Sequence, residues 1–152
     1  MRTPSDPGGV SVEGPRHASI TVPSRVESIR CAADFIIEVA RTMHVPAADD
    51  SLFESAVVEA LNNAIEHGNA AQHPDAMTAC ELEVDGRRLT VRIFGKGPPF
   101  ALRPGPAPEW NAADLSSLPE GGLGIHIIRG VFPDVRTVTR GGEFGLEMVL
   151  TF

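Results

Sequence analysis

Apolar residues recur along the chain at two spacings, and the changes between them mark the predicted elements. An alternating run at 18–22 predicts a strand that ends at Pro23. Helical spacing follows, and Ser24 is placed to cap a helix that stops near 43–45, just before Pro46. The apolar positions of this helix are Val26, Ile29, Ala33, Ile36, Ile37 and Ala40.

A second helical pattern begins around 47–50, where acidic residues suit the positive end of the helix dipole. It continues to Gly68, a residue type that commonly ends helices. Val57, Leu61 and Ile65 are four residues apart and therefore lie on one side of this helix, which we expect to face the core.

The rest of the chain contains hairpin signals. Strand-like runs at 78–84 and 88–94 are joined by Asp85-Gly86, a dipeptide typical of hairpin turns. A short helix at 122–131 and two final strands, at 135–140 and 143–152 and joined by Gly141-Gly142, complete the chain. The resulting order, β-α-α-β-β-loop-α-β-β, predicts an α+β two-layer sandwich with helices on one face of a mixed, mostly antiparallel sheet.

Composition and charge narrow the function classes. Thirteen basic and twenty acidic residues give a net charge of −7, which argues against nonspecific binding to nucleic acid or to an anionic membrane. Residues 1–17 are rich in Pro, Gly and Ser and lack the apolar core of a signal peptide. We expect a flexible tail there, followed by one domain at 18–152, in a cytoplasmic protein. Cys31 and Cys80 lack metal-binding spacing and are predicted to be buried, reduced thiols.

The second helix carries a polar stripe opposite its apolar side. Glu59, Asn63 and His67 are each four residues apart, so a carboxylate, an amide and an imidazole share one face. These groups can accept a proton, ligate a hard cation and donate a hydrogen bond. A solvated polar face is the alternative. The pair Asn62-Asn63 favours a functional site, because asparagine is a poor helix former in a helix interior.

Two glycine-containing segments suggest ligand loops. In GGLGIHIIRG, residues 121–130, glycines lead directly into a helix, whose amide groups suit an anion such as phosphate. It follows a Pro- and Gly-rich loop at 98–121 that is long for a compact domain. In VRIFGKGPPF, residues 91–100, a strand ends at Gly-x-Gly, which is typical of a close approach of the backbone to a ligand and also of a simple turn.

Four blocks of the sequence resemble the GHKL ATPase superfamily, which has the Bergerat ATP-binding fold and includes DNA gyrase and the histidine kinases. Glu59-x-x-x-Asn63-Ala-x-x-His67 resembles its N-box, and GGLGIHIIRG resembles its second glycine box. Together with ITVPSRVESIR and VRIFGKGPPF, these blocks are similar to the RsbW-like anti-sigma-factor serine/threonine kinases of bacterial partner-switching systems. The likeness covers nearly the whole chain after the tail and implies a histidine-kinase-like ATPase domain.

The resemblance implies roles for individual residues. Glu59 would be the general base that activates a serine hydroxyl, and Asn63 would ligate the magnesium ion that bridges the phosphates of ATP. For His67, a structural hydrogen bond at the helix end is an alternative to nucleotide contact. Nucleotide binding is implied for Asn63, His67, Gly95, Gly97, Gly122, Leu123 and Gly124, with an ATP lid around 101–121.

The first glycine box departs from the family pattern. Relatives usually carry an aspartate that accepts a hydrogen bond from the adenine amino group, and Gly95 stands in its place, although Gly97 is kept. A charge-assisted hydrogen bond contributes about 1.5–3 kcal/mol, so its loss would weaken binding roughly ten- to hundredfold. Glu120 occupies a position that is basic in some members of the family and Glu in others.

Two functions remain open on these residues. The first is an ATP-Mg-dependent kinase that binds a sigma factor or another client and phosphorylates a STAS-domain antagonist. The second is a non-catalytic relative that keeps the protein-binding surfaces and binds nucleotide weakly or not at all. The intact Glu59 and Asn63 favour the first function, and Gly95 favours the second.

The resemblance also implies a homodimer that grips its client. Residues 20–37, with Arg25 and Arg30, are the candidate contact region, and a solvated helix face is the alternative. Trp110 is the only tryptophan and falls in the predicted lid.

Overall fold

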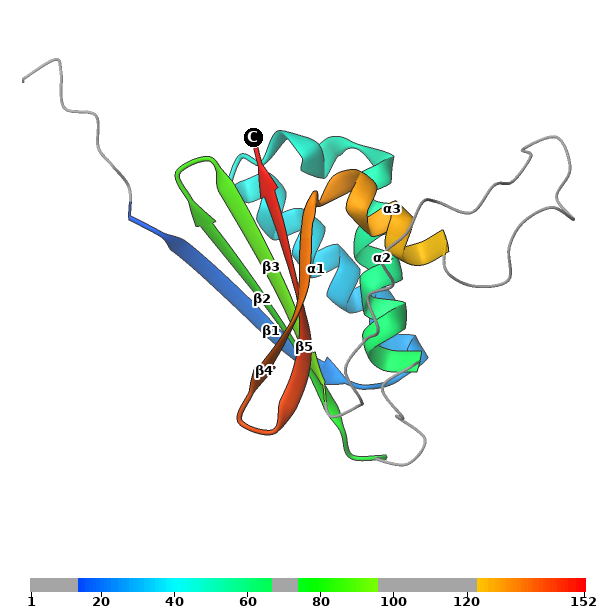
Figure 1. Cartoon of the computed structure of the whole chain (residues 1–152). Coiled ribbons are helices and arrows are strands. Elements are labelled where there is room, and N and C mark those ends of the chain that lie inside the picture. The colour runs from blue at the N-terminus through cyan, green and yellow to red at the C-terminus, as the bar shows by residue number, and fades with distance from the viewer. Residues whose placement is uncertain (1–13, 67–73, 96–122) are drawn as a thin grey trace, which may run out of the picture.

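The computed structural model describes residues 14–66, 74–95 and 123–152, and Figure 1 shows one sheet with helices packed on one of its faces. The strands are β1 (Arg16–Pro23), β2 (Met77–Asp85), β3 (Arg88–Gly95), β4 (Asp134–Arg140) and β5 (Glu143–Thr151). The helices are α1 (Ile29–Thr42), α2 (Ser51–Glu66) and α3 (Leu123–Val131), with short 3-10 helices η1 (Val26–Ser28) and η2 (Pro46–Asp49). The predicted α+β two-layer sandwich and the order of its main elements are confirmed.

The sheet has the strand order β1-β2-β3-β5-β4. Every pairing among these strands is antiparallel, whereas the sequence predicted a mixed, mostly antiparallel sheet. The β4–β5 hairpin turns at the predicted Gly141-Gly142, where both residues have positive φ. In the β2–β3 hairpin Asp85 pairs with Arg88, so the turn is Gly86-Arg87. The prediction placed that turn one residue too early.

The core lies between the sheet and the helices. Along each strand, inward-facing apolar side chains alternate with side chains on the opposite face, as the pleat of a strand requires. Val57, Leu61 and Ile65 of α2 are almost completely buried, which confirms the predicted core side of this helix. Phe53 of α2 packs against Phe132, which follows α3, with ring centroids 5.6 Å apart. This contact fixes α3 against α2.

The first helix begins later than predicted, because the residue predicted to cap it has another partner. Ser24 Oγ and Thr78 Oγ1 are hydrogen-bonded at 2.8 Å, and the Ser24 amide donates to Ala76 O at 2.9 Å. These bonds tie the end of β1 to the start of β2. The chain then forms η1, and Val26, which was assigned to the apolar stripe, is 59% exposed.

The end of α1 agrees with the prediction. His44 N–H donates to Arg41 O at 2.9 Å, and Val45 N–H donates to Ala40 O at 3.0 Å, which is the Schellman pattern of a helix C-terminus. His44 has a φ of 62°, the left-handed conformation that this pattern requires. Pro46 follows and begins η2.

The two cysteines differ in their surroundings. Cys80 on β2 is fully buried, and burial raises the pKa of its thiol to about 12. Cys31 is exposed, so the prediction of a buried thiol is wrong at that position. The reason is its place on α1, where the neighbouring Ala32 and Ala33 fill the side that faces the core.

β1 begins at Arg16, so Arg16 and His17, which were predicted to belong to the tail, are part of the sheet. Within the described ranges, no helix is long and apolar enough to cross a membrane.

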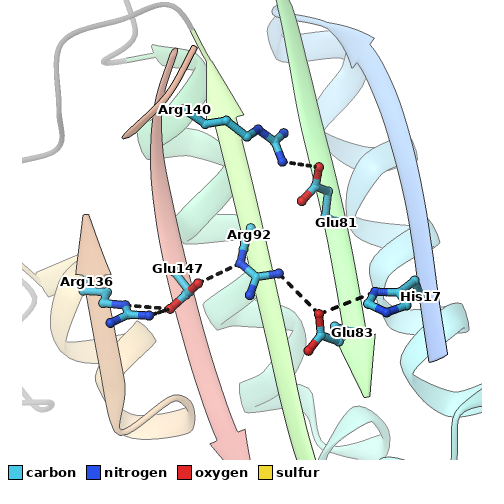
Figure 2. A network of polar contacts seen from close by, with 7 residues as sticks. All are labelled: His17, Glu81, Glu83, Arg92, Arg136, Arg140 and Glu147. Atoms are coloured by element: carbon cyan, nitrogen blue, oxygen red, sulfur yellow. Dashed lines mark hydrogen bonds and ion pairs between the residues drawn. The ribbon is translucent and has the colours of Figure 1, made fainter. Parts of the chain in front are cut away.

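The sheet face opposite the helices carries a network of ion pairs (Figure 2). Glu147 of β5 accepts hydrogen bonds from Arg92 Nε at 2.7 Å and from Arg136 Nε at 2.6 Å. Arg92 Nη1 also lies 3.7 Å from Glu83 Oε2, which lies 3.5 Å from His17 Nδ1. These contacts connect all five strands in the order in which they pair.

Arg140 of β4 reaches across the sheet beside this network (Figure 2). Its guanidinium carbon lies 3.9 Å from the centroid of the Phe94 ring, and its Nη1 lies 2.8 Å from Glu81 Oε1. Gly145 pairs with Phe94 in the β3–β5 register, and the Phe94 ring packs directly over it. This packing fixes the end of β3, where Gly95 faces the helices.

Candidate functional site

α2 presents Glu59 and Asn63 on the same stripe, one turn apart. Asp50 sets where this helix starts, because its Oδ1 accepts a hydrogen bond from the Leu52 N–H at 2.9 Å, as an N-cap residue does. The Glu59 and Asn63 side chains are half-buried, at the border between the core side of α2 and its surface. The predicted polar stripe is therefore present at two of its three positions, and the third, His67, lies outside the described residues.

The side-chain amide of Asn63 has an unused donor. Its Nδ2 is buried and has no hydrogen-bond partner among the described residues. Leaving a buried donor without a partner costs about 1–3 kcal/mol, and asparagine is also a poor helix former. A buried donor without a partner calls for one, so the amide is a candidate for binding a ligand.

Gly124 of α3 lies directly against Glu59. A β-carbon at residue 124 would lie 2.5 Å from Glu59 Oε2 and 3.4 Å from Glu59 Cδ. The carboxylate therefore occupies the space that any other residue type at 124 would fill. Both residues belong to the ligand site that the sequence predicts. The sequence does not reveal their contact, because helical periodicity relates positions within a helix and not positions on two helices.

Gly95, at the end of β3, lies on the side of the site that faces the sheet. A β-carbon at residue 95 would lie 3.7 Å from Ala64 O, an ordinary van der Waals distance. The end of β3 therefore lies beside the turn of α2 that carries Asn63. Ala64 carries no sequence signal of this contact, because a small apolar residue on a helix does not indicate such a neighbour.

The structure thus brings together Glu59, Asn63, Gly95 and Gly124, from one strand and two helices that are well separated in the sequence. Leu123 precedes Gly124 as the first residue of α3. The other predicted parts of the site, namely His67, Gly97, Gly122, Glu120, Trp110 and the lid around 101–121, lie outside the described residues.

The oxygen donors of the site suit a hard cation. The Glu59 carboxylate and the Asn63 amide oxygen are ligand types that Mg²⁺ accepts. Within the described residues, no group of three or more His, Cys, Asp or Glu side chains could hold a metal ion. Mg²⁺ is often held by one or two protein ligands, with water and substrate phosphates completing its coordination. The donor set therefore fits a magnesium ion that arrives with a nucleotide.

The chain belongs to the histidine kinase-like ATPase domain family, whose sequence pattern matches residues 22–152. That match includes every element of the site described above. Membership of an ATPase domain family implies nucleotide binding in general terms. No curated protein matches this chain in sequence.

The fold is also similar to a solved structure, that of the RsbU and RsbW domains of Rv1364c from Mycobacterium tuberculosis. The TM-score is 0.57 at 14% sequence identity, and the match covers 90% of this chain but 32% of the other. This chain therefore spans about a third of the length of its structural neighbour. At this identity the similarity supports the fold, and it agrees with the family assignment.

Proposed function

We propose that this protein is a partner-switching regulator that acts as a serine/threonine protein kinase, using ATP and Mg²⁺ to phosphorylate a STAS-domain antagonist. The observation that carries the proposal is the meeting of Glu59 with Gly124, because it brings a carboxylate on α2 to the first turn of α3. A helix N-terminus favours anions such as phosphates, and the carboxylate can accept a proton from a hydroxyl.

The Glu59 and Asn63 side chains each have a defined part in this proposed reaction. Glu59 would accept the proton of the substrate serine as its oxygen attacks the γ-phosphorus, while the bond from that phosphorus to the bridging oxygen breaks and ADP leaves. Asn63 would hold Mg²⁺ through its amide oxygen, and the ion would neutralise charge on the phosphates. Ordered amide groups at the start of α3 would orient the phosphates.

The proposed partners are a sigma factor or another client and a STAS-domain antagonist, in a cytoplasmic homodimer. Support comes from the structural neighbour, which contains an RsbW domain. Residues 20–37 remain the candidate contact region. Arg25 in this region is exposed, whereas Arg30 is paired with Asp34 at 2.9 Å and with Glu54 at 3.0 Å. Arg25 is therefore the better candidate for contacting an acidic partner.

Calorimetry with ATP and Mg²⁺, followed by a phosphate-transfer assay on the cognate STAS-domain antagonist, tests the kinase function. We expect saturable ATP-Mg binding and transfer to a serine of the antagonist. Glu59→Ala should lower the transfer rate about 10²- to 10⁴-fold, the usual contribution of a general base. It should leave the affinity for ATP-Mg nearly unchanged, because the base acts on the hydroxyl and not on the nucleotide.

Glu59→Gln is the matched control, because it keeps the size of the side chain and removes its basicity. A Glu59→Gln variant that transfers phosphate as fast as the parent would contradict the assignment of the base. Binding of a sigma factor or antagonist without any nucleotide binding would contradict the kinase function altogether.

Gly95 favours a second candidate function, a non-catalytic regulator that binds its protein partners and has little affinity for nucleotide. The residue has no side chain to accept a hydrogen bond from a base. The same calorimetric experiment distinguishes the two functions, since this second one predicts partner binding that ATP-Mg does not alter.

A further inference from the structure

We propose that Gly124 is a positioning residue for Glu59: its lack of a side chain leaves the space that the carboxylate occupies, so the first turn of α3 determines where the base lies. This inference rests on the proposed kinase function for its catalytic consequence. Its structural part, a steric coupling between α2 and α3, is independent of any nucleotide.

Residue 124 limits the position of the Glu59 carboxylate on one side. A methyl group at 124 would approach Glu59 Oε2 to 2.5 Å, well inside van der Waals contact, and Glu59 Cδ to 3.4 Å. Among the described residues, none donates a hydrogen bond to the Glu59 carboxylate. The close approach of residue 124 is thus one steric restraint on this side chain.

The same geometry predicts that a substitution of Gly124 displaces the Glu59 carboxylate more than it disturbs the fold. The atom that a methyl group would meet is the end of a flexible side chain, which can rotate away without moving the backbone of either helix. Gly124 lies in α3, so alanine at this position also suits the helix. A displacement of about 1 Å is enough to slow a reaction roughly 10²-fold.

Gly130 provides a matched control. It lies in the same helix, and a β-carbon there would have nothing within 4 Å. Gly124→Ala and Gly130→Ala therefore make the same chemical change in one helix, with and without a neighbour. We expect Gly124→Ala to lower the maximal rate of phosphate transfer about 10- to 100-fold. Gly130→Ala should leave that rate unchanged.

The affinity for ATP separates positioning from loss of the nucleotide site. Alanine keeps the backbone amide of residue 124, and its β-carbon would point toward Glu59, so the Kd for ATP-Mg should change less than about threefold while the transfer rate falls. A loss of ATP affinity as large as the loss of rate would overturn the inference, because residue 124 would then act on the nucleotide directly.

Shortening the base tests the steric coupling. Glu59→Asp withdraws the carboxylate by one carbon–carbon bond, about 1.5 Å, away from residue 124. Gly124→Ala should then have little further effect, so its rate penalty should fall to about threefold or less in this background. An equal penalty in both backgrounds would overturn the coupling.

Thermal unfolding tests the contact without nucleotide. In a Glu59→Ala background, Gly124→Ala should raise Tm, because only the gain in helix propensity remains. With Glu59 present, Gly124→Ala should raise Tm less or should lower it. The change in Tm caused by Gly124→Ala should differ by about 2 °C between the two backgrounds. Additive changes would overturn the inference even in an active kinase. A wild-type protein that neither binds nor uses ATP would refute the proposed function. The Tm values of the parent, the two single variants and the double variant would still decide whether the contact exists.

Discussion

At the end of β3, the backbone does not require the glycine at position 95. Gly95 has no positive φ, and a β-carbon there would meet Ala64 O at an ordinary 3.7 Å. Gly124 and Gly145 differ, since a side chain at either would collide with a neighbour. The described backbone therefore accepts a residue with a β-carbon at position 95.

Gly95→Asp should tighten the binding of ATP-Mg about ten- to hundredfold, because a carboxylate that accepts a hydrogen bond from the adenine amino group contributes about 1.5–3 kcal/mol. Competitive calorimetry with ATP and GTP measures this gain and should show it for ATP alone. Gly95→Asn is the control, because it has nearly the same shape without the charge and should give a smaller gain. Equal tightening of GTP would contradict a role for position 95 in reading adenine.

Among single residues, the sequence predicted those parts of the site that lie within one helix. The spacing of Glu59 and Asn63 fixes their common face, since helical geometry is local. The contact of Glu59 with Gly124 and the approach of Gly95 to Ala64 depend on how separate elements pack, and no residue pattern encodes that distance.

Among the elements, β3 and β5 leave no room for a side chain where Phe94 pairs with Gly145. A β-carbon at 145 would lie 2.6 Å from Phe94 Cδ1 and 2.9 Å from Ile93 O. The second of these atoms belongs to the backbone of the neighbouring strand and cannot rotate away. Arg140 lies against Phe94 as well, so the ring has little freedom to move.

Gly145→Ala should therefore destabilise the protein by about 1–3 kcal/mol, the usual cost of forcing extra atoms into a packed region. Urea unfolding gives the change in the free energy of unfolding. Gly130→Ala, made at an open position of α3, is the comparison and should be neutral or slightly stabilising. If Gly145→Ala proves neutral as well, the close packing of β3 and β5 described here is incorrect.

Two element boundaries that have local causes were predicted correctly from the sequence. Gly141-Gly142 marks a turn because both residues take a positive φ, and α1 ends before Pro46 as its Schellman pattern allows. The start of α1 did not follow the sequence, because the Ser24 hydroxyl bonds to Thr78 on another strand. The local sequence does not reveal this long-range hydrogen bond, which takes up the side chain that was predicted to cap the helix.

For the whole molecule, the network around Glu147 ties the five strands together on the face without helices. The Glu147 side chain is only 6% exposed. Burial works to raise the pKa of its carboxyl group, but the hydrogen bonds from Arg92 and Arg136 outweigh burial, so the pKa is lowered overall. A group whose pKa is lower in the folded state stabilises the protein at neutral pH and loses that contribution as the pH falls through its folded-state value.

Glu147→Gln should lower the free energy of unfolding at pH 7 by about 1–3 kcal/mol, because two arginines lose a charged hydrogen-bond acceptor. The difference between the two proteins should begin to shrink as the pH falls below about 4.5, where glutamate in the unfolded chain takes up a proton, and should be lost once the pH is below the lowered pKa of Glu147 in the folded parent. Urea unfolding of both proteins between pH 7 and pH 3 measures the difference, and all other carboxylates titrate equally in the pair. A difference that does not depend on pH would contradict the ionised network.

The unequal exposure of the two cysteines makes the natural chain a ready substrate for site-specific labelling. Cys80 is enclosed in the core, and its raised pKa keeps it protonated and unreactive. Cys31 is exposed on α1, inside the region 20–37 proposed to contact a client. A maleimide fluorophore would attach at that single position of the folded protein, so the arrival of a sigma factor or an antagonist could be followed by fluorescence without engineering the sequence.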